Sequence, residues 1–160
     1  MIDLAATQRA LISDGSTGWS VGASFLAKPS STPLNFTATA TSGGTLTALQ
    51  SLLAPNYSVL GGWDFTTDAG YTPGDPAYLS FGIGSSYSAN GLEVWHLDGS
   101  NWSPFAANDL TYDGNYASFT VTGFSGYAVT GSVVPEPTTL AMLGTALAGM
   151  ALWACKRRLG

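Results

Sequence analysis

Charged side chains are scarce in this chain of 160 residues. Asp, Glu, Lys and Arg together make up 9% of it, against about 25% in a typical soluble domain. Helices of soluble proteins need a charged outer face, so the composition argues against a helical bundle. Only five Lys and Arg residues stand against ten Asp and Glu residues. Because no basic stripe is present that would neutralise phosphates, we expect no nucleic-acid partner.

Histidine and cysteine are almost absent as well. His96 is the single histidine, so a zinc site would need carboxylates to complete it, and a Ser/His/Asp triad would need three distant strands to converge. Cys155 is the single cysteine and cannot form an internal disulfide. Asp64, Asp68 and Asp75 do not follow the spacing of a calcium-binding loop. The sequence therefore predicts a protein that is not an enzyme and holds no metal or cofactor.

Glycine and aromatic residues are plentiful. The chain has 20 Gly residues and is 12% aromatic, and the aromatic content argues against disorder. Apolar and polar residues alternate, as they do in strands, at residues 18–25, 34–41, 57–65, 77–83, 92–97, 116–122 and 127–130. Asp98-Gly99 and Asp113-Gly114 lie between such stretches and predict hairpin turns. The fold class we expect is all-β, an antiparallel β-sandwich of about seven strands over residues 17–132.

Three segments around these strands are less regular. Asp3 is a candidate N-cap for a short helix that ends near Ile12, within a short N-terminal segment at residues 1–16. Residues 46–53 fit a short helix or the start of a strand. Residues 66–76 are typical of a loop.

The last 28 residues, 133–160, differ sharply from the rest. The nineteen residues from Pro137 to Cys155 carry no charge, and as a helix they would span nearly 30 Å, about the thickness of a bilayer core. We predict a transmembrane helix at 138–155, a buried helix of a soluble protein being the alternative. Its apolar and interfacial positions include Thr138, Leu140, Met142, Leu143, Leu147, Met150, Leu152 and Trp153.

A basic end follows this apolar run. Lys156, Arg157 and Arg158 form it, whereas residues 1–134 contain two cations and nine acidic residues. Positive residues next to a membrane helix stay on the cytoplasmic side. The precursor is therefore expected in the inner membrane, with its C-terminus in the cytoplasm and its acidic body outside.

The tripeptide Pro135-Glu136-Pro137 follows Val134 and stands directly before the apolar run. Each proline fixes its own φ and pushes the residue before it toward an extended conformation, so the backbone is presented without helix or strand hydrogen bonds. Residues 134–158, VPEPTTLAMLGTALAGMALWACKRR, closely resemble the PEP-CTERM sorting signal of Gram-negative bacteria that make extracellular polysaccharide. The resemblance implies cleavage by exosortase, a membrane-embedded cysteine transpeptidase, and then release or attachment at the cell surface.

An exported protein also needs an N-terminal export signal. Residues 1–10, MIDLAATQRA, have no basic region ahead of an apolar run. We therefore expect a signal peptide, and further domain residues, upstream of Met1. Insertion as a tail-anchored protein without a signal peptide is the alternative.

The pieces LEVWHLDGSNW and FTVTGFSGYAVTG resemble the β domain often found upstream of this sorting signal, for which no defined activity is known. Their Phe-Ser step is also similar to that of autoproteolytic sandwich domains, in which a histidine before Phe-Ser activates the serine. This chain has Gly123 in that position. Without that histidine, Ser125 is expected to lack a general base, which argues against self-cleavage.

Two features suggest binding. Trp63, Trp95 and Trp102 would offer stacking platforms to sugar rings if their faces were exposed. The threonines at 37, 39, 41, 45 and 47 would form a flat ice-binding array if they lay on one sheet face. The sequence thus predicts an exported cell-surface or extracellular-matrix protein with a structural or adhesive β domain. The alternatives are a carbohydrate-binding module of the exopolysaccharide matrix, a matrix polysaccharide hydrolase and an ice-binding surface.

Overall fold

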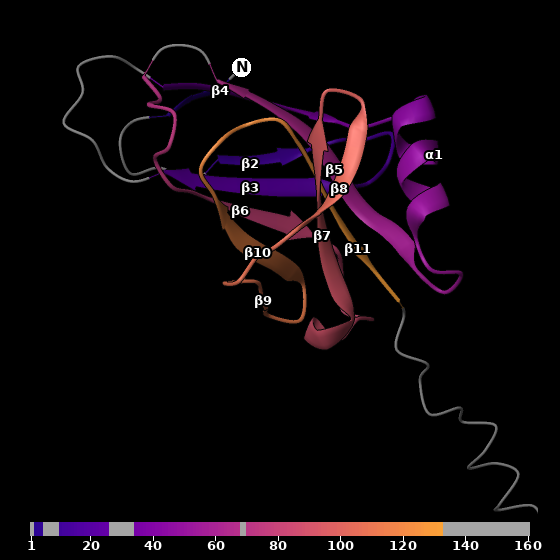
Figure 1. Cartoon of the computed structure of the whole chain (residues 1–160). Helices are drawn as coiled ribbons and strands as arrows, with labels where there is room; N and C mark the ends of the chain where they lie inside the picture. The colour runs from indigo at the N-terminus through magenta and orange to yellow at the C-terminus, as the bar shows by residue number, and fades with distance from the viewer. Residues whose placement is uncertain (1, 5–9, 26–33, 68–69, 133–160) are drawn as a thin grey trace, which may run out of the picture.

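Two antiparallel sheets face each other and enclose one core (Figure 1). The computed structural model describes residues 2–4, 10–25, 34–67 and 70–132. The six-stranded sheet has the spatial order β1 (Ile2–Leu4), β4 (Leu34–Ala40), β5 (Ser58–Thr67), β11 (Gly126–Gly131), β7 (Leu92–Asp98) and β8 (Asn101–Phe105). The five-stranded sheet has the order β2 (Ala10–Ser13), β3 (Ser20–Phe25), β6 (Ala77–Gly82), β10 (Tyr116–Val121) and β9 (Thr111–Tyr112).

Aromatic side chains from both sheets fill the space between them. Phe36 stacks on Phe65 in the six-stranded sheet, with ring centroids 5.6 Å apart, and Phe81 stacks on Phe119 in the other sheet at 5.5 Å. Phe65 meets Phe81 edge-on at 6.1 Å and so joins the two sheets. All four rings are fully buried. Edge-on and offset contacts of this kind stabilise a core beyond the area that they bury.

Strand β11 forms the centre of the six-stranded sheet. It pairs with β5 on one side and with β7 on the other, and all six of its residues are buried. Its last residue, Gly131, lies opposite Ser58 of β5 and Leu92 of β7. The ladder therefore holds the chain on both sides up to Gly131.

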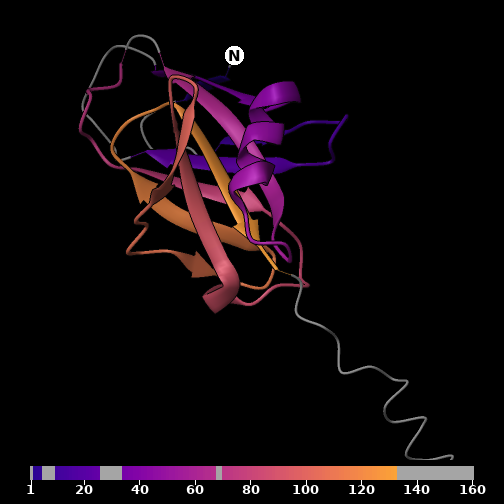
Figure 2. The ribbon, with the colours of Figure 1, turned by 45° about the vertical axis from the view of Figure 1, so that its right-hand side comes forward.

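Helix α1 (Gly43–Leu52) covers the outer face of the six-stranded sheet, as Figures 1 and 2 show. Its buried residue Leu49 belongs to a second cluster with Trp95, Trp102 and Ala128. The indole Nε1 of Trp102 donates a hydrogen bond to the carbonyl oxygen of Thr45 at 2.9 Å. This contact ties the helix to β8.

The expected strands are all present, with shifts of a residue or two at their ends. The hairpin turn predicted at Asp98-Gly99 joins β7 to β8, and the turn at Asp113-Gly114 joins β9 to β10. Residues 43–52 are helical, which decides the question left open for residues 46–53.

The helix expected from Asp3 to Ile12 is wrong. Residues 10–13 form β2, which pairs with β3. The apolar period is two, not 3.6: Ala10 and Ile12 pack against the core, whereas Leu11 is 56% exposed. Tertiary pairing with β3 outweighs the weak capping signal.

The C-terminal predictions concern residues that the structure does not describe. The helix expected at 138–155 lies in residues 133–160, outside the described part. Within the described ranges, no helix has the length and apolarity that crossing a membrane requires.

The end of β11 provides a test of the core packing. A Cβ atom added to Gly131 would meet Leu92 Cδ2 at 2.9 Å and Leu60 Cδ1 at 3.1 Å. Gly131→Ala should therefore lower the free energy of unfolding by about 1–3 kcal/mol through overpacking. Chemical denaturation measures the change. Gly91→Ala is the matched control, because its added Cβ would have its nearest neighbour at 3.7 Å, and an equal loss there would contradict the explanation.

Candidate functional site

The three tryptophans proposed for sugar stacking are buried. Trp63 lies in the core and is 1% exposed, while Trp95 and Trp102 lie beneath α1 and are 9% and 8% exposed. The indole of Trp95 donates a hydrogen bond to Thr130 Oγ1 at 3.2 Å. A sugar stacks on a ring face that solvent reaches, so the structure does not support this role for these rings.

The threonine array does not form either. Thr37 and Thr39 lie on β4, but Thr41 is 7% exposed and follows that strand. Thr45 and Thr47 belong to α1. A flat ice-binding face needs its hydroxyls on one sheet surface, and the helix removes these two from it.

A serine and the single histidine meet near the start of β11. Nε2 of His96 lies 2.7 Å from Oγ of Ser125, and the imidazole packs against the Tyr127 ring at a centroid distance of 4.9 Å. The expectation that Ser125 has no base beside it is therefore wrong. The antiparallel register places Tyr127 opposite His96, which brings β7 alongside Ser125.

The surroundings of this pair are structural in character. Burial raises the pKa of Tyr127, and its hydroxyl donates to the carbonyl oxygen of Gly123 at 3.2 Å. The backbone N–H of Phe65 donates to the carbonyl oxygen of Ser125 at 3.0 Å. These bonds fix the turn between β10 and β11 against both neighbouring strands.

No metal site emerges in the part of the chain that the structure covers, because it contains no group of three His, Cys, Asp or Glu residues able to hold an ion. Asp68 lies outside the described residues.

The outer face of the five-stranded sheet is uncharged and rich in hydroxyl groups. One row of paired residues runs across all five strands in the middle of this face. Because side chains alternate between the two faces of a strand, the paired residues two positions before and two positions after this row lie on the same face. We call this surface the hydroxyl face. It consists of Leu11, Ser13, Ser20, Gly22, Ser24, Tyr78, Ser80, Gly82, Thr111, Tyr116, Ser118 and Thr120.

Two tyrosines border the small side chains of the hydroxyl face. Tyr78 is 40% exposed, and its hydroxyl lies 3.3 Å from Thr111 Oγ1. Tyr116 is half-buried on β10. Between them, Ser118 donates a hydrogen bond to Ser80 at 2.9 Å. Ser80 and Ser118 are buried, whereas Ser13 and Thr111 are exposed. The exposed hydroxyl groups and the ring of Tyr78 lie on one sheet face and are suited to a neutral polar ligand.

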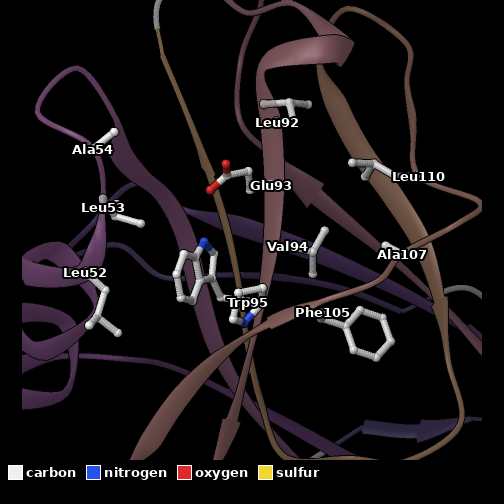
Figure 3. Close-up of a pocket in the computed structure, with 11 residues that line it drawn as sticks. Leu52, Leu53, Ala54, Leu92, Glu93, Val94, Trp95, Phe105, Ala107 and Leu110 are labelled. Atoms are coloured by element: carbon white, nitrogen blue, oxygen red, sulfur yellow. The ribbon is translucent and has the colours of Figure 1, made fainter.

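A hollow of about 480 Å³ opens beside the first half of β7 (Figure 3). Leu52, Leu53 and Ala54, at the end of α1, form one side of it. Strand β8 stops opposite Val94, so the start of β7 has no β8 partner there. Glu93 is the charged residue among the lining side chains, which are otherwise apolar.

Comparison with known proteins bears on the end of the chain. Residues 133–158 match the family model described as the PEP-CTERM protein-sorting motif. The chain carries a PEP-CTERM signal. The expected resemblance is thereby confirmed, and the β-rich structure upstream is consistent with it. No curated protein and no solved structure matches the chain.

The signal supports exosortase-dependent sorting of an exported surface protein, made as a membrane-anchored precursor. The sorting residues Val134 to Pro137 and the basic end 156–158 lie within the match but outside the described residues. What the structure does place is the point where the chain leaves the sandwich, at Gly131 and Ser132.

Sequence reasoning missed the hydroxyl face and the His96–Ser125 contact for different reasons. The face was visible in part, because Ser24, Tyr78 and Thr120 occupy the polar positions of predicted strands. Their alignment needed the sheet order. The contact joins residues 29 positions apart, and no local pattern encodes such a pairing.

The role of Ser125 can be measured. Ser125→Ala should lower the free energy of unfolding by about 1 kcal/mol, because it leaves the His96 ring nitrogen without its partner. Ser100→Ala, at an exposed turn position, should have no effect. Intact mass of the purified wild type should show an uncut chain. Fragments split between Phe124 and Ser125, absent from Ser125→Ala, would contradict a structural role.

Proposed function

We propose that this protein is a structural or adhesive component of the bacterial cell surface or extracellular matrix, sorted and cleaved by exosortase through its C-terminal signal. The observation that carries the proposal is the PEP-CTERM motif at residues 133–158. The signal directs the β domain to the outside of the cell, as other cleaved hydrophobic tails do for the proteins to which they belong. The domain itself is not an enzyme in this proposal.

The chemistry of the domain supports a passive role. Most of its aromatic residues lie in the core or in the cluster under α1, where they are not available to a ligand. His96 is held by Ser125 and two aromatic rings. The hollow beside β7 is lined by apolar groups and contains one carboxylate, Glu93, whereas glycoside hydrolysis uses a pair of carboxylic acids.

Cleavage should depend on the two prolines of the motif. Replacing Pro135 and Pro137 with Ala frees φ and restores the amide hydrogens, so the following helix can extend upstream and hide the backbone from the enzyme. Full-length precursor should then accumulate in the membrane fraction. Immunoblotting of cell fractions, together with C-terminal peptide mapping of the surface form, measures this.

Deletion of the exosortase should have the same effect as the two alanine substitutions. Asp113→Ala, in the turn between β9 and β10, should leave processing unchanged and serves as the control. Recovery of an intact LWACKRRLG terminus on the mature surface protein would contradict sorting and leave a plain membrane anchor.

A second candidate function, binding of a neutral exopolysaccharide, is favoured by the hydroxyl face. This surface contains no charged residue and carries Tyr78 with 40% of its side chain exposed. Such a surface fits uncharged sugar rings, which stack on an aromatic side chain and hydrogen-bond to hydroxyl groups. In this proposal Tyr78 and Tyr116, and not the tryptophans, stack on the sugar rings.

Affinity electrophoresis with neutral polysaccharides tests this function. The double variant Tyr78→Ala, Tyr116→Ala should be retarded less, because its affinity for the polysaccharide falls at least about tenfold, equivalent to about 1.4 kcal/mol. Tyr57→Ala, in the loop between α1 and β5, should bind as the wild type does. Equal retardation of all three proteins would exclude the hydroxyl face as the binding site.

A further inference from the structure

Few residues of the chain separate the sorting motif from the last strand of the domain. Gly131 is the last residue of β11, and the three residues 132–134 connect it to Pro135, the first proline of the motif. A fully extended chain spans about 3.3–3.6 Å per residue, so Pro135 lies no more than about 14 Å from Gly131. An enzyme that holds the motif in its active site must therefore come within this distance of the sandwich.

Unpairing the end of β11 to lengthen this tether would disrupt the domain. Gly131 is paired with Ser58 on one side and with Leu92 on the other. The preceding residue, Thr130, is fully buried and accepts the hydrogen bond from Trp95. Releasing β11 would break two ladders and open the core, whereas an edge strand would lose only one ladder.

The two chain segments that surround this exit are uncharged and partly apolar, and the exposed Glu93 follows directly after the second of them. We call it the exit face, and it consists of residues 52–58, which end α1 and lead into β5, and residues 88–92, which lead through η1 (Ala89–Gly91) into β7. Neither segment contains Asp, Glu, Lys or Arg. Leu52 is 54% exposed, and a Cβ added to Gly91 would lie 3.7 Å from the hydroxyl of Ser132.

The hollow beside β7 is continuous with the exit face. Leu52, Leu53 and Ala54 line it from one side and Leu92 from the other, and Figure 3 shows the side chains of Glu93 and Trp95 between these two groups. Leu92 is also the ladder partner of Gly131. A largely apolar recess, with Glu93 as its charged residue, thus lies next to the last residue of β11.

We infer that the exit face contacts exosortase while the motif is bound, with the hollow receiving apolar side chains of the enzyme; this inference rests on the proposed function. The short tether brings the enzyme to this face, and the two segments of the face can be covered without the cost of burying an unpaired ion. The carboxylate of Glu93, which lines the hollow, is exposed and has to keep its contact with water or meet a cationic group of the enzyme. The domain is then part of what the enzyme recognises, in addition to the motif. A protein partner is favoured over lipid because the face has no basic residue to attract anionic headgroups.

A charge placed on the exit face tests the contact. In the full-length chain, expressed in cells that contain the exosortase, Leu52→Glu and Leu52→Lys should both slow conversion of precursor to mature protein by about tenfold, equivalent to about 1.4 kcal/mol of interaction. The matched controls are Leu11→Glu and Leu11→Lys, because Leu11 is equally exposed but lies on the other sheet. Pulse-chase immunoblotting gives the rates.

A longer tether should remove the effect. Inserting about 12 Gly and Ser residues between Ser132 and Val133 adds roughly 20 Å of mean reach, so the enzyme no longer has to meet the exit face. Leu52→Glu with this insert should be processed as fast as the insert alone. Ala54→Glu provides a second variant at the hollow, and circular dichroism of each purified precursor checks that the sheets are formed.

Three results would overturn the inference. Unchanged processing of both Leu52 variants and Ala54→Glu would show that the face is not contacted. If processing of Leu52→Glu stays slow when the insert is present, the substitution acts through something other than contact between the exit face and the enzyme. Slowing by Glu together with acceleration by Lys would indicate contact with anionic lipid instead. Failure of the proposed function is a separate result, in which chains with Pro135→Ala and Pro137→Ala are processed normally in every background.

Discussion

The two-sided pairing of β11 is the constraint on which the rest of the structure depends. This strand joins β5 to β7, and its residues contribute to both clusters: Tyr127 and Val129 face the core, while Ala128 faces α1. Small residues at both ends of the strand allow the neighbouring chains to approach closely. The strand β11, which joins the two halves of the six-stranded sheet, is also the last strand before the sorting signal.

Burial on both faces of the six-stranded sheet explains where sequence reasoning worked and where it did not. Alternation located β3, β6 and β10 well, because the five-stranded sheet has one apolar and one polar face. Alternation along β7 and β8 could not decide whether the faces of Trp95 and Trp102 are exposed, and in the structure α1 covers them. A covering helix 40 or more residues away leaves no trace in a strand's own pattern.

The candidate sites divide in the same way. The sorting signal was recognisable because its three parts are contiguous in the chain, and the family match covers them at residues 133–158. The His96–Ser125 contact and the hydroxyl face depend on sheet register. Register is set by packing across the whole sandwich, and so these two features could be found only in the folded structure.

The position of β11 also governs how the domain responds to force. A protein attached at the cell surface through the residues that follow Gly131 is pulled along the axis of its central strand. Hydrogen bonds to β5 and β7 then bear the load in shear, many at once, whereas a terminal edge strand would be peeled away bond by bond. The fold thus places a strand that is paired on both sides directly before the residues that carry the sorting signal.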